Sequence, residues 1–215
     1  MARFLDNIPD VTRNLLYLNL IMFVATLINP AFMNHTFAMA FPLADDFRWW
    51  QPVTHMFMHA NFMHIFFNMY SLVMFGMVVE RALGTRDFII FYLITGFGAV
   101  LLHTGVEWLQ VLSLIKENPG VDPQTIYNYI PGVLGASGAV YGVLVGFAML
   151  YPEARLTLIF PPVTLDAKWW VAIFIGIELI MGITGTQMGV AHFAHLGGAL
   201  FGWLLIRRWK KKGSL

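Results

Sequence analysis

Cysteine is absent from this chain, and charged residues are scarce: Asp, Glu, Lys and Arg make up only 12% of the 215 residues. The first absence excludes disulfide bonds and thiol chemistry. The second excludes an ordinary soluble domain, in which about a quarter of the residues are charged. Hydrophobic residues instead reach 58% and aromatic residues 15%. The sequence therefore predicts a polytopic membrane protein.

Six charge-poor stretches approach the roughly 20 apolar residues that cross a bilayer as a helix. They are Leu15–Phe32, Phe57–Val79, Phe88–Leu109, Val133–Leu150, Trp169–Ile183 and Val190–Ile206. No repeat and no change of composition divides the chain, so we expect one all-α domain over residues 1–215, a bundle of six transmembrane helices. The N-terminus lacks the basic-then-apolar layout of a cleavable signal, and we expect the first span to be retained.

The basic residues predict the orientation of this bundle. With six spans, eleven of the thirteen Lys and Arg residues fall on the side of the two termini, and the opposite side keeps only Arg48 and Lys116. Because positively charged loops remain in the cytoplasm, we expect both termini to be cytoplasmic. We interpret the basic C-terminal tail as a topology signal rather than as a nucleic-acid-binding site.

The most informative motif opens the fourth apolar stretch, where Ser137 stands between Gly135-Ala136 and Gly138. Backbone N–H groups at a helix start have no intrahelical acceptor, so they can stabilise negative charge that develops on a bound carbonyl. A serine hydroxyl at such a helix start, with a base in reach, forms an acyl-transfer site. Ser137 is therefore a candidate nucleophile.

Polar side chains lie on one face of the second apolar stretch. His64 and Asn68 are four residues apart and therefore share one side of a helix. Such groups are costly in hydrocarbon unless they face a partner or a water-filled cavity. Both carry N–H donors, and we interpret them as candidate donors to an oxyanion. Asn61 and Ser71 are more simply explained as interhelical hydrogen-bonding residues.

The last apolar stretch supplies a candidate base, His195. Small residues lie near it around the helix, and glycine recurs at every fourth position of the fourth stretch. They are Ala191, Gly198 and Gly202 in the sixth stretch and Gly138, Gly142 and Gly146 in the fourth. Such stripes favour close packing of helices, so we expect the fourth and sixth helices to meet along them and to bring His195 to Ser137. Tyr141, one turn after Ser137, is a candidate to support the imidazole.

Several spaced motifs occur together between Trp50 and Gly202. They are His59 with His64-x-x-x-Asn68, Gly76-x-x-x-Glu80 before Gly84, Gly135-x-Ser137-Gly138 followed by Tyr141, and Ala194-His195-x-x-Gly198-x-x-x-Gly202. In the spacing and order of these motifs, the chain resembles the rhomboid intramembrane serine proteases of the compact six-helix bacterial type. One departure is Gln51 after Trp50, where the family often has arginine. This difference weakens any expectation about hydrogen bonding in the first outer loop.

The resemblance implies an endopeptidase of the cell (inner) membrane that cleaves single-span membrane proteins within the lipid bilayer, without a metal or another cofactor. It implies a catalytic dyad of Ser137 and His195, and an oxyanion site formed by the Ser137 N–H with His64 and Asn68. No acidic residue lies in the sixth stretch to complete a triad, so we expect packing against Tyr141 to orient the imidazole. In the family, the region of Gly182–Gly189 acts as gate and cap. The sequence makes no prediction of oligomeric state.

Three other interpretations remain open. His55-x-x-x-His59 and His192-x-x-His195 imitate the histidine boxes of di-iron enzymes, but these need about eight converging ligands and the chain has seven histidines. A catalytically silent relative that only binds membrane helices would have lost the serine or the histidine, and both are present. Glu178 would suit proton-coupled transport, although we favour a glutamate that is hydrogen-bonded to a neighbouring helix.

Overall fold

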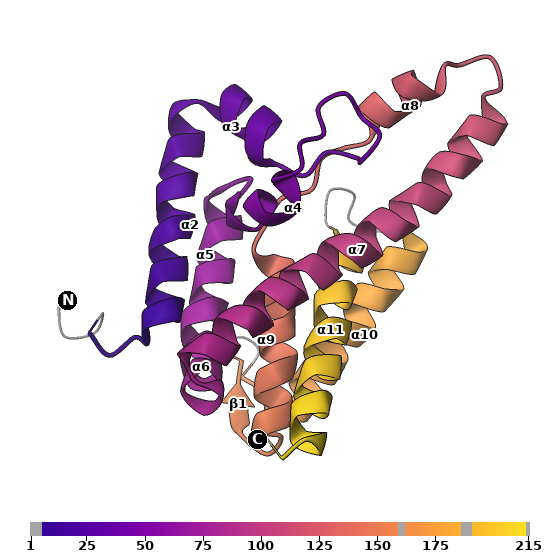
Figure 1. Ribbon diagram of the computed structural model, residues 1–215. Coiled ribbons are helices and arrows are strands. Elements are labelled where there is room, and N and C mark those ends of the chain that lie inside the picture. Colours follow the sequence, from indigo (N-terminus) through magenta and orange to yellow (C-terminus); the bar gives the residue numbers. More distant parts are fainter. Residues whose placement is uncertain (1–5, 159–161, 186–190, 214–215) are drawn as a thin grey trace.

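The computed structural model describes residues 6–158, 162–185 and 191–213, which are mostly helical (Figure 1). The helices are α2 (Asp10–Ile28), α3 (Pro30–Phe37), α4 (Gln51–Thr54), the 3₁₀-helix η1 (His55–Phe57), α5 (Phe62–Ser71), the π-helix η2 (Leu72–Gly76), α6 (Met77–Leu83), α7 (Thr85–Glu117), α8 (Pro123–Tyr129), α9 (Ser137–Leu150), α10 (Ala167–Thr184) and α11 (His192–Lys211). Two short antiparallel strands, β1 (Arg155–Thr157) and β2 (Thr164–Asp166), follow α9. Apart from this hairpin, the regular elements of the described residues are helical, in agreement with the expected all-α class.

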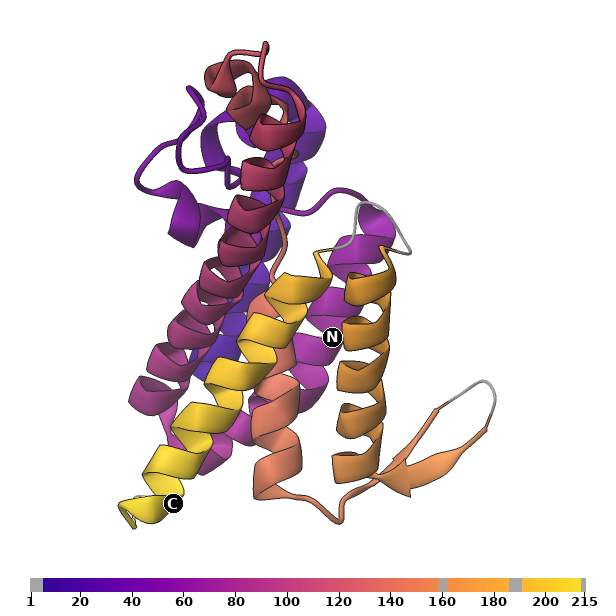
Figure 2. The same ribbon diagram turned by 90° about the vertical axis from the view of Figure 1, so that its right-hand side faces the viewer.

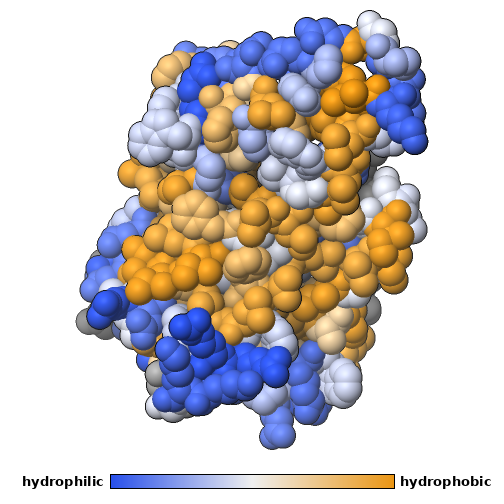
Figure 3. Space-filling model, turned by 45° about the vertical axis from the view of Figure 1, so that its right-hand side comes forward, coloured by the Kyte–Doolittle hydropathy of each residue, from blue (hydrophilic) through white to orange (hydrophobic). Residues whose placement is uncertain are grey.

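Within the described residues, four helical stretches are long and apolar enough to span a membrane: Asp10–Ile28, Phe62–Leu83, Thr85–Glu117 and Ala167–Thr184. α9 is apolar but has only 14 residues, and α11 has 20 residues but ends in a basic segment. Each of the six apolar stretches overlaps one or more helices, but six spans are not confirmed as a count. Figure 3 shows a broad apolar band between two hydrophilic ends, as expected of a protein embedded in lipid.

The first apolar stretch is interrupted where we expected a continuous helix. α2 ends at Ile28, and the Asn29 side chain accepts a hydrogen bond from the Phe32 N–H at 3.2 Å. Asn29 thereby caps a new helix, α3, whose first residue is Pro30. Asparagine is a preferred N-cap and proline a preferred first helical residue, so the local sequence explains the break.

Helix α2 receives its N-terminal cap from another helix. The Glu80 carboxylate on α6 accepts hydrogen bonds from the N–H groups of Val11 and Thr12, at 2.9 and 2.7 Å, and from the Thr12 hydroxyl at 2.7 Å. Glu80 is buried. Its charge complements the positive end of the helix and satisfies N–H groups that have no intrahelical acceptor. The Glu80 of the Gly76-x-x-x-Glu80 motif therefore joins α6 to α2.

Helix α9 lies in the middle of the bundle and is contacted by α7, α10 and α11 (Figures 1 and 2). Gly142 of α9 lies against α7 on one side, because a Cβ on Gly142 would lie 2.5 Å from Thr95 of α7. α11 approaches a different side of α9, where a Cβ on Gly198 would overlap the carbonyl oxygen of Gly138. A Cβ on Gly202 would likewise lie 2.9 Å from the Cα of Gly142. The glycines of α9 and α11 therefore meet as expected, and Gly142 in addition admits α7.

The start of α2, the turn between α6 and α7, the β-hairpin and the end of α11 lie at the same end of the molecule (Figure 1). Most basic residues belong to these segments: Arg13, Arg81, Arg86, Arg155, Lys168, Arg207, Arg208, Lys210, Lys211 and Lys212. Arg3 lies outside the described residues. The fold thus gathers the basic residues that predict the orientation, and the cytoplasmic location of this end stays a prediction.

Candidate active site

Ser137 is the first residue of α9, and the chain enters this helix through a glycine that the local backbone requires. Gly135 has φ +133°, a backbone conformation that residues other than glycine rarely adopt. Its N–H donates to the His55 carbonyl at 2.9 Å. A Cβ at this position would lie 2.9 Å from the His64 ring and 3.5 Å from Ser137 Oγ. Glycine therefore keeps the space open between the His64 ring and Ser137.

Ser137 Oγ lies 2.7 Å from His195 Nε2, which is hydrogen-bond distance. The two residues are 58 positions apart in the chain, and His195 is buried. His195 stands near the start of α11, one turn before Gly198, where α11 meets the backbone of α9. The structure thus brings the candidate nucleophile and the candidate base together through the close approach of these two helices.

Tyr141 packs flat against the imidazole of His195. The ring centroids are 4.4 Å apart and the planes are inclined by 8°. The Tyr141 hydroxyl lies on α9 and donates a hydrogen bond to Glu178 Oε1 on α10 at 2.5 Å. The tyrosine therefore contacts the imidazole with its ring and a carboxylate with its hydroxyl.

Glu178 reaches the candidate base from a helix on which we expected no acidic partner. Its Oε1 lies 2.9 Å from His195 Nδ1, and its Oε2 lies 2.6 Å from His192 Nδ1. We expected the imidazole to be oriented without a carboxylate because the sixth apolar stretch contains none. That reasoning considered only one helix, and the carboxylate comes from α10. A lone glutamate in an apolar stretch was the available signal, but spacing alone did not show which neighbour it contacts.

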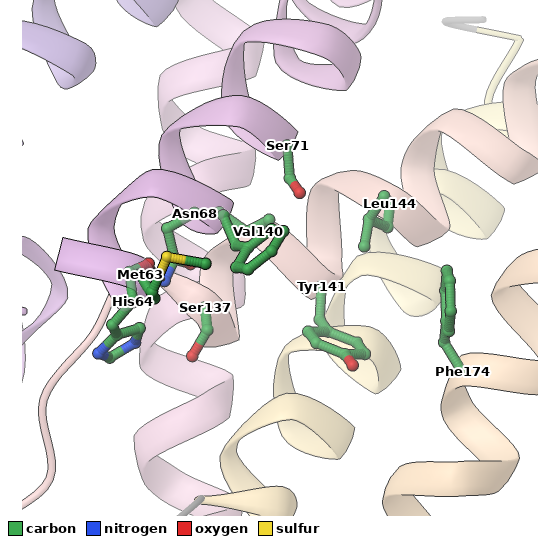
Figure 4. A pocket seen from close by; sticks show the side chains of 10 residues that line it. Met63, His64, Asn68, Ser71, Ser137, Val140, Tyr141, Leu144 and Phe174 are labelled. Carbon is green, nitrogen blue, oxygen red and sulfur yellow. Dashed lines mark hydrogen bonds between the residues drawn. The ribbon is translucent and has the colours of Figure 1, made fainter. Parts of the chain in front are cut away.

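A cavity of about 400 Å³ adjoins Ser137 between α5, α9 and α10. Figure 4 shows Met63, His64 and Asn68 on one wall and Phe174 on the other, with Ser137 and Tyr141 between them. Both candidate oxyanion donors therefore line the same cavity as the candidate nucleophile. Met63 is more than half exposed and Phe174 is half-buried, so the walls of the cavity continue into the apolar surface.

His64 is held at the start of α5 by short-range hydrogen bonds. The Asn61 side chain caps this helix by accepting from the His64 N–H at 2.9 Å. His64 Nδ1 accepts a long hydrogen bond of 3.4 Å from the Ala60 N–H, which favours the tautomer with its proton on Nε2. Asn68 uses one of its two N–H groups to donate to the His64 carbonyl at 2.9 Å. The other N–H of Asn68 and the Nε2–H of His64 have no protein partner among the described residues and can serve the cavity.

Gln51 organises the outer loop although it replaces the arginine that is frequent in the resembled family. Its Oε1 accepts from the N–H groups of Ala40 and Arg48, at 3.2 and 3.1 Å, and its Nε2 donates to the carbonyls of Asp46 and His35, at 3.0 and 3.4 Å. The side chain is fully buried. The loop before α4 thus has a central amide that makes four hydrogen bonds.

The histidine pairs do not converge on one metal centre within the described part of the chain. The only described group of three potential ligands there is Glu178, His192 and His195, whose ligand atoms lie within 4.8 Å of one another. Their carboxylate–imidazole distances of 2.6 and 2.9 Å are those of direct contacts, whereas ligands of a tetrahedral zinc ion lie about 3.3 Å apart. His55 is not in this group; its Nδ1 contacts the Gln51 carbonyl at 3.0 Å, and burial lowers its pKa to about 4.

Residues 46–210 match the model of the rhomboid domain. The chain belongs to the rhomboid family. It is 30% identical over 159 residues to the rhomboid protease AarA of Providencia stuartii, an alignment that covers 73% of this chain and 54% of that protein. It is 32% identical over 169 residues to the chloroplastic rhomboid-like protein 11 of Arabidopsis thaliana, covering 74% of this chain and 51% of that protein.

A mitochondrial relative is also similar. The human presenilin-associated rhomboid-like protein is 31% identical over 147 residues, which cover 68% of this chain and 34% of that protein. The chain thus spans about half the length, or less, of the curated relatives that it matches. These comparisons confirm the family that the spaced motifs indicated, and the family contains at least one protein named as a protease.

Proposed function

We propose that this protein is an intramembrane serine endopeptidase that cleaves transmembrane segments of other membrane proteins. One observation carries the proposal: Ser137 Oγ lies 2.7 Å from His195 Nε2 beside a cavity whose walls continue into the apolar surface. A serine hydroxyl and an imidazole at this distance form the nucleophile–base pair of acyl transfer. The similarity to a rhomboid protease supports the same activity.

Acylation begins with the Ser137 hydroxyl. Its oxygen attacks the carbonyl carbon of the scissile peptide bond while His195 Nε2 takes the hydroxyl proton. The carbonyl oxygen becomes an oxyanion in the tetrahedral intermediate. The imidazolium then returns the proton to the leaving amine, the C–N bond breaks, and the new N-terminus departs. The remaining half of the substrate is bound to Ser137 as an ester.

The oxyanion needs donors that are in place before the reaction. The Ser137 N–H is at the start of α9, where N–H groups have no intrahelical acceptor. His64 and Asn68 present side-chain donors to the same cavity. In the second half of the reaction, His195 removes a proton from water, whose oxygen attacks the ester carbonyl. The imidazolium returns this proton to Ser137 Oγ as the ester C–O bond breaks, which releases the acid product and restores the hydroxyl. Neither half requires a cofactor.

Substrates reach such a site from the bilayer. The cavity lies between α5 and α10, and Met63 and Phe67 on its α5 wall are more than half exposed. A substrate helix in lipid can therefore approach without crossing water. We infer that the substrates are single-span membrane proteins. Residues 186–189 of the expected gate and cap region lie outside the described residues.

We propose a location in the cell (inner) membrane with both termini in the cytoplasm, and the arrangement of charge supports this orientation. Basic side chains are gathered at the end that holds the start of α2 and the end of α11, and positive loops remain cytoplasmic. We assign these charges to topology and propose no nucleic-acid partner.

A fluorophosphonate probe tests the proposed function directly, because it forms a covalent bond only with an activated serine. The wild-type protein in lipid nanodiscs is expected to be labelled at Ser137, and Ser137→Ala is expected to show no labelling while it keeps its thermal unfolding temperature. In parallel, the wild type and not Ser137→Ala should cut a reconstituted single-span substrate. If the folded wild type neither reacts nor cuts, the chain is a silent helix-binding relative and the proposal is wrong.

A further inference from the structure

We propose that Glu178 of α10 completes a Ser137–His195–Glu178 triad. Glu178 is a positioning residue: it orients the imidazole of His195 and stabilises the positive charge that this ring gains when it takes a proton. The inference rests on the proposed hydrolytic function, because it assigns a role within the same site. It differs from a dyad in one respect: a carboxylate faces the imidazole nitrogen that does not face the serine.

The two nitrogens of His195 define the relationship. Nε2 lies 2.7 Å from Ser137 Oγ, and Nδ1 lies 2.9 Å from Glu178 Oε1. A carboxylate beside Nδ1 favours the tautomer with its proton there, which leaves the Nε2 lone pair for the serine proton. When His195 takes that proton it becomes cationic, and the adjacent carboxylate stabilises the new charge.

The surroundings of Glu178 fix its carboxylate. Oε1 accepts from the Tyr141 hydroxyl at 2.5 Å, and Oε2 contacts His192 Nδ1 at 2.6 Å. The titratable groups that face it are therefore Tyr141 from α9 and His192 and His195 from α11. Glu178 is buried. Because burial of an unpaired carboxylate is costly, these three partners explain how an acidic side chain is kept at this depth.

The geometry indicates how Glu178 acts. The contact with His195 Nδ1 has ion-pair distance, but Nδ1 makes no hydrogen bond of good angle to any partner in the described chain. Coulombic attraction depends on distance, whereas a hydrogen bond also depends on alignment. We therefore expect the catalytic rate to depend more on the negative charge of Glu178 than on the geometry of its hydrogen bonds. A residue that only joined helices would show no such dependence on charge.

Two substitutions of Glu178 test this expectation in nanodiscs, with the exposed neighbour Ile177→Ala as the α10 control. Glu178→Gln removes the charge and keeps the size. We expect it to lower both fluorophosphonate labelling and kcat for substrate cleavage by about 10²- to 10³-fold, with KM nearly unchanged. We expect Glu178→Asp, which keeps the charge, to lose about tenfold or less. Ile177→Ala should match the wild type in both assays.

The pH–rate profile separates this role from a structural one. In Glu178→Gln the acid limb of the profile should move to lower pH, because the imidazolium loses a neighbouring anion, whereas in Glu178→Asp it should stay near that of the wild type. A residue that only joins helices would lower the melting temperature and substrate cleavage but would leave probe labelling and the acid limb unchanged.

Three results would overturn the triad. The first is that Glu178→Gln is labelled by the fluorophosphonate probe as fast as the wild type. The second is that the folded Glu178→Asp and Glu178→Gln variants lose kcat equally. The third is that phenanthroline inactivates the wild type and Zn²⁺ restores it, which would make Glu178, His192 and His195 a metal centre. If the wild type is labelled and Glu178→Gln reacts equally fast, the triad is wrong while the serine protease proposal stands. If the folded wild type itself neither reacts nor cuts, the proposed function fails.

Discussion

Tyr141 and His195 stack with their ring centroids 4.4 Å apart and their planes nearly parallel. Because Tyr141 follows Ser137 by one turn of α9, a single helix carries both the proposed nucleophile and the surface on which the proposed base rests. The contact with Tyr141 of α9 orients the imidazole of His195 on α11. The distance between the proposed base and the proposed nucleophile thus depends on the spacing of Ser137 and Tyr141 along α9.

Substitution of Tyr141 separates its two contacts. Tyr141→Phe keeps the stacked ring and loses the hydrogen bond to Glu178, and we expect about tenfold slower cleavage at saturating substrate. Tyr141→Ala also removes the ring, and we expect a loss of about a hundredfold or more because the imidazole is no longer held in place. Initial rates with a reconstituted substrate measure both effects. Equal rates for the two folded variants would show that the stacking does not orient His195.

Alanine substitution of the polar residues at the site grades their roles. We expect His195→Ala to be inactive, because His195 is the residue beside the Ser137 hydroxyl. We expect His64→Ala to lose about 10²- to 10³-fold, the usual effect of removing one oxyanion donor, and Asn68→Ala to lose less. His192→Ala should keep substantial activity, because it contacts Glu178 rather than the serine.

The same series tests the metal interpretation. A metal cage would make His55, His59, His192 and His195 about equally indispensable, and EDTA would inhibit. The measurement is the initial cleavage rate of each variant with and without chelator. If folded His192→Ala is as inactive as His195→Ala, the assignment of His195 as the sole base is incomplete.

Gly198 controls how closely α11 approaches the nucleophile. In Gly198→Ala the added methyl group would overlap the Gly138 carbonyl oxygen, so α11 must move away from α9. A displacement of about 1 Å between reacting groups can cost roughly a hundredfold in rate, and we expect a lower melting temperature as well. Gly105→Ala on α7 is the matched control, since a Cβ there meets nothing within 4 Å. A Gly198→Ala protein as stable and active as the control would contradict the packing described.

Glu80 should affect stability rather than chemistry. Glu80→Ala removes the acceptor of three hydrogen bonds at the start of α2, and we expect a loss of roughly 1–3 kcal/mol in the free energy of unfolding. No residue of α2 lines the cavity beside Ser137, so probe labelling of the folded fraction should change little. Thermal unfolding measures the first effect, with exposed Glu153→Ala as the control. Unchanged stability of Glu80→Ala would show that the cap is not needed.

Most of the helices and the family could be predicted from the sequence. Charge-poor stretches coincide with α2, α5 to α6, α7, α9, α10 and α11, because only apolar side chains are stable in lipid. Ser137 was placed at a helix start because glycines flank it, and α9 begins there. His64 and Asn68 were assigned to one helix face from their spacing, and both line the cavity beside Ser137.

Contacts between helices could not be read in the same way. Sequence spacing determines which residues share a face of one helix, whereas packing determines how each helix is rotated and offset against its neighbours. For this reason the sequence did not show that Gly142 also packs against α7, left Glu178 without an assigned partner, and gave no hydrogen bonds for Gln51. The position of Ser137 at a helix start and the positions of the apolar helices were determined by the sequence itself. The contact of Glu178 with His195 was decided only by tertiary structure, since it depends on how α10 lies against α9 and α11.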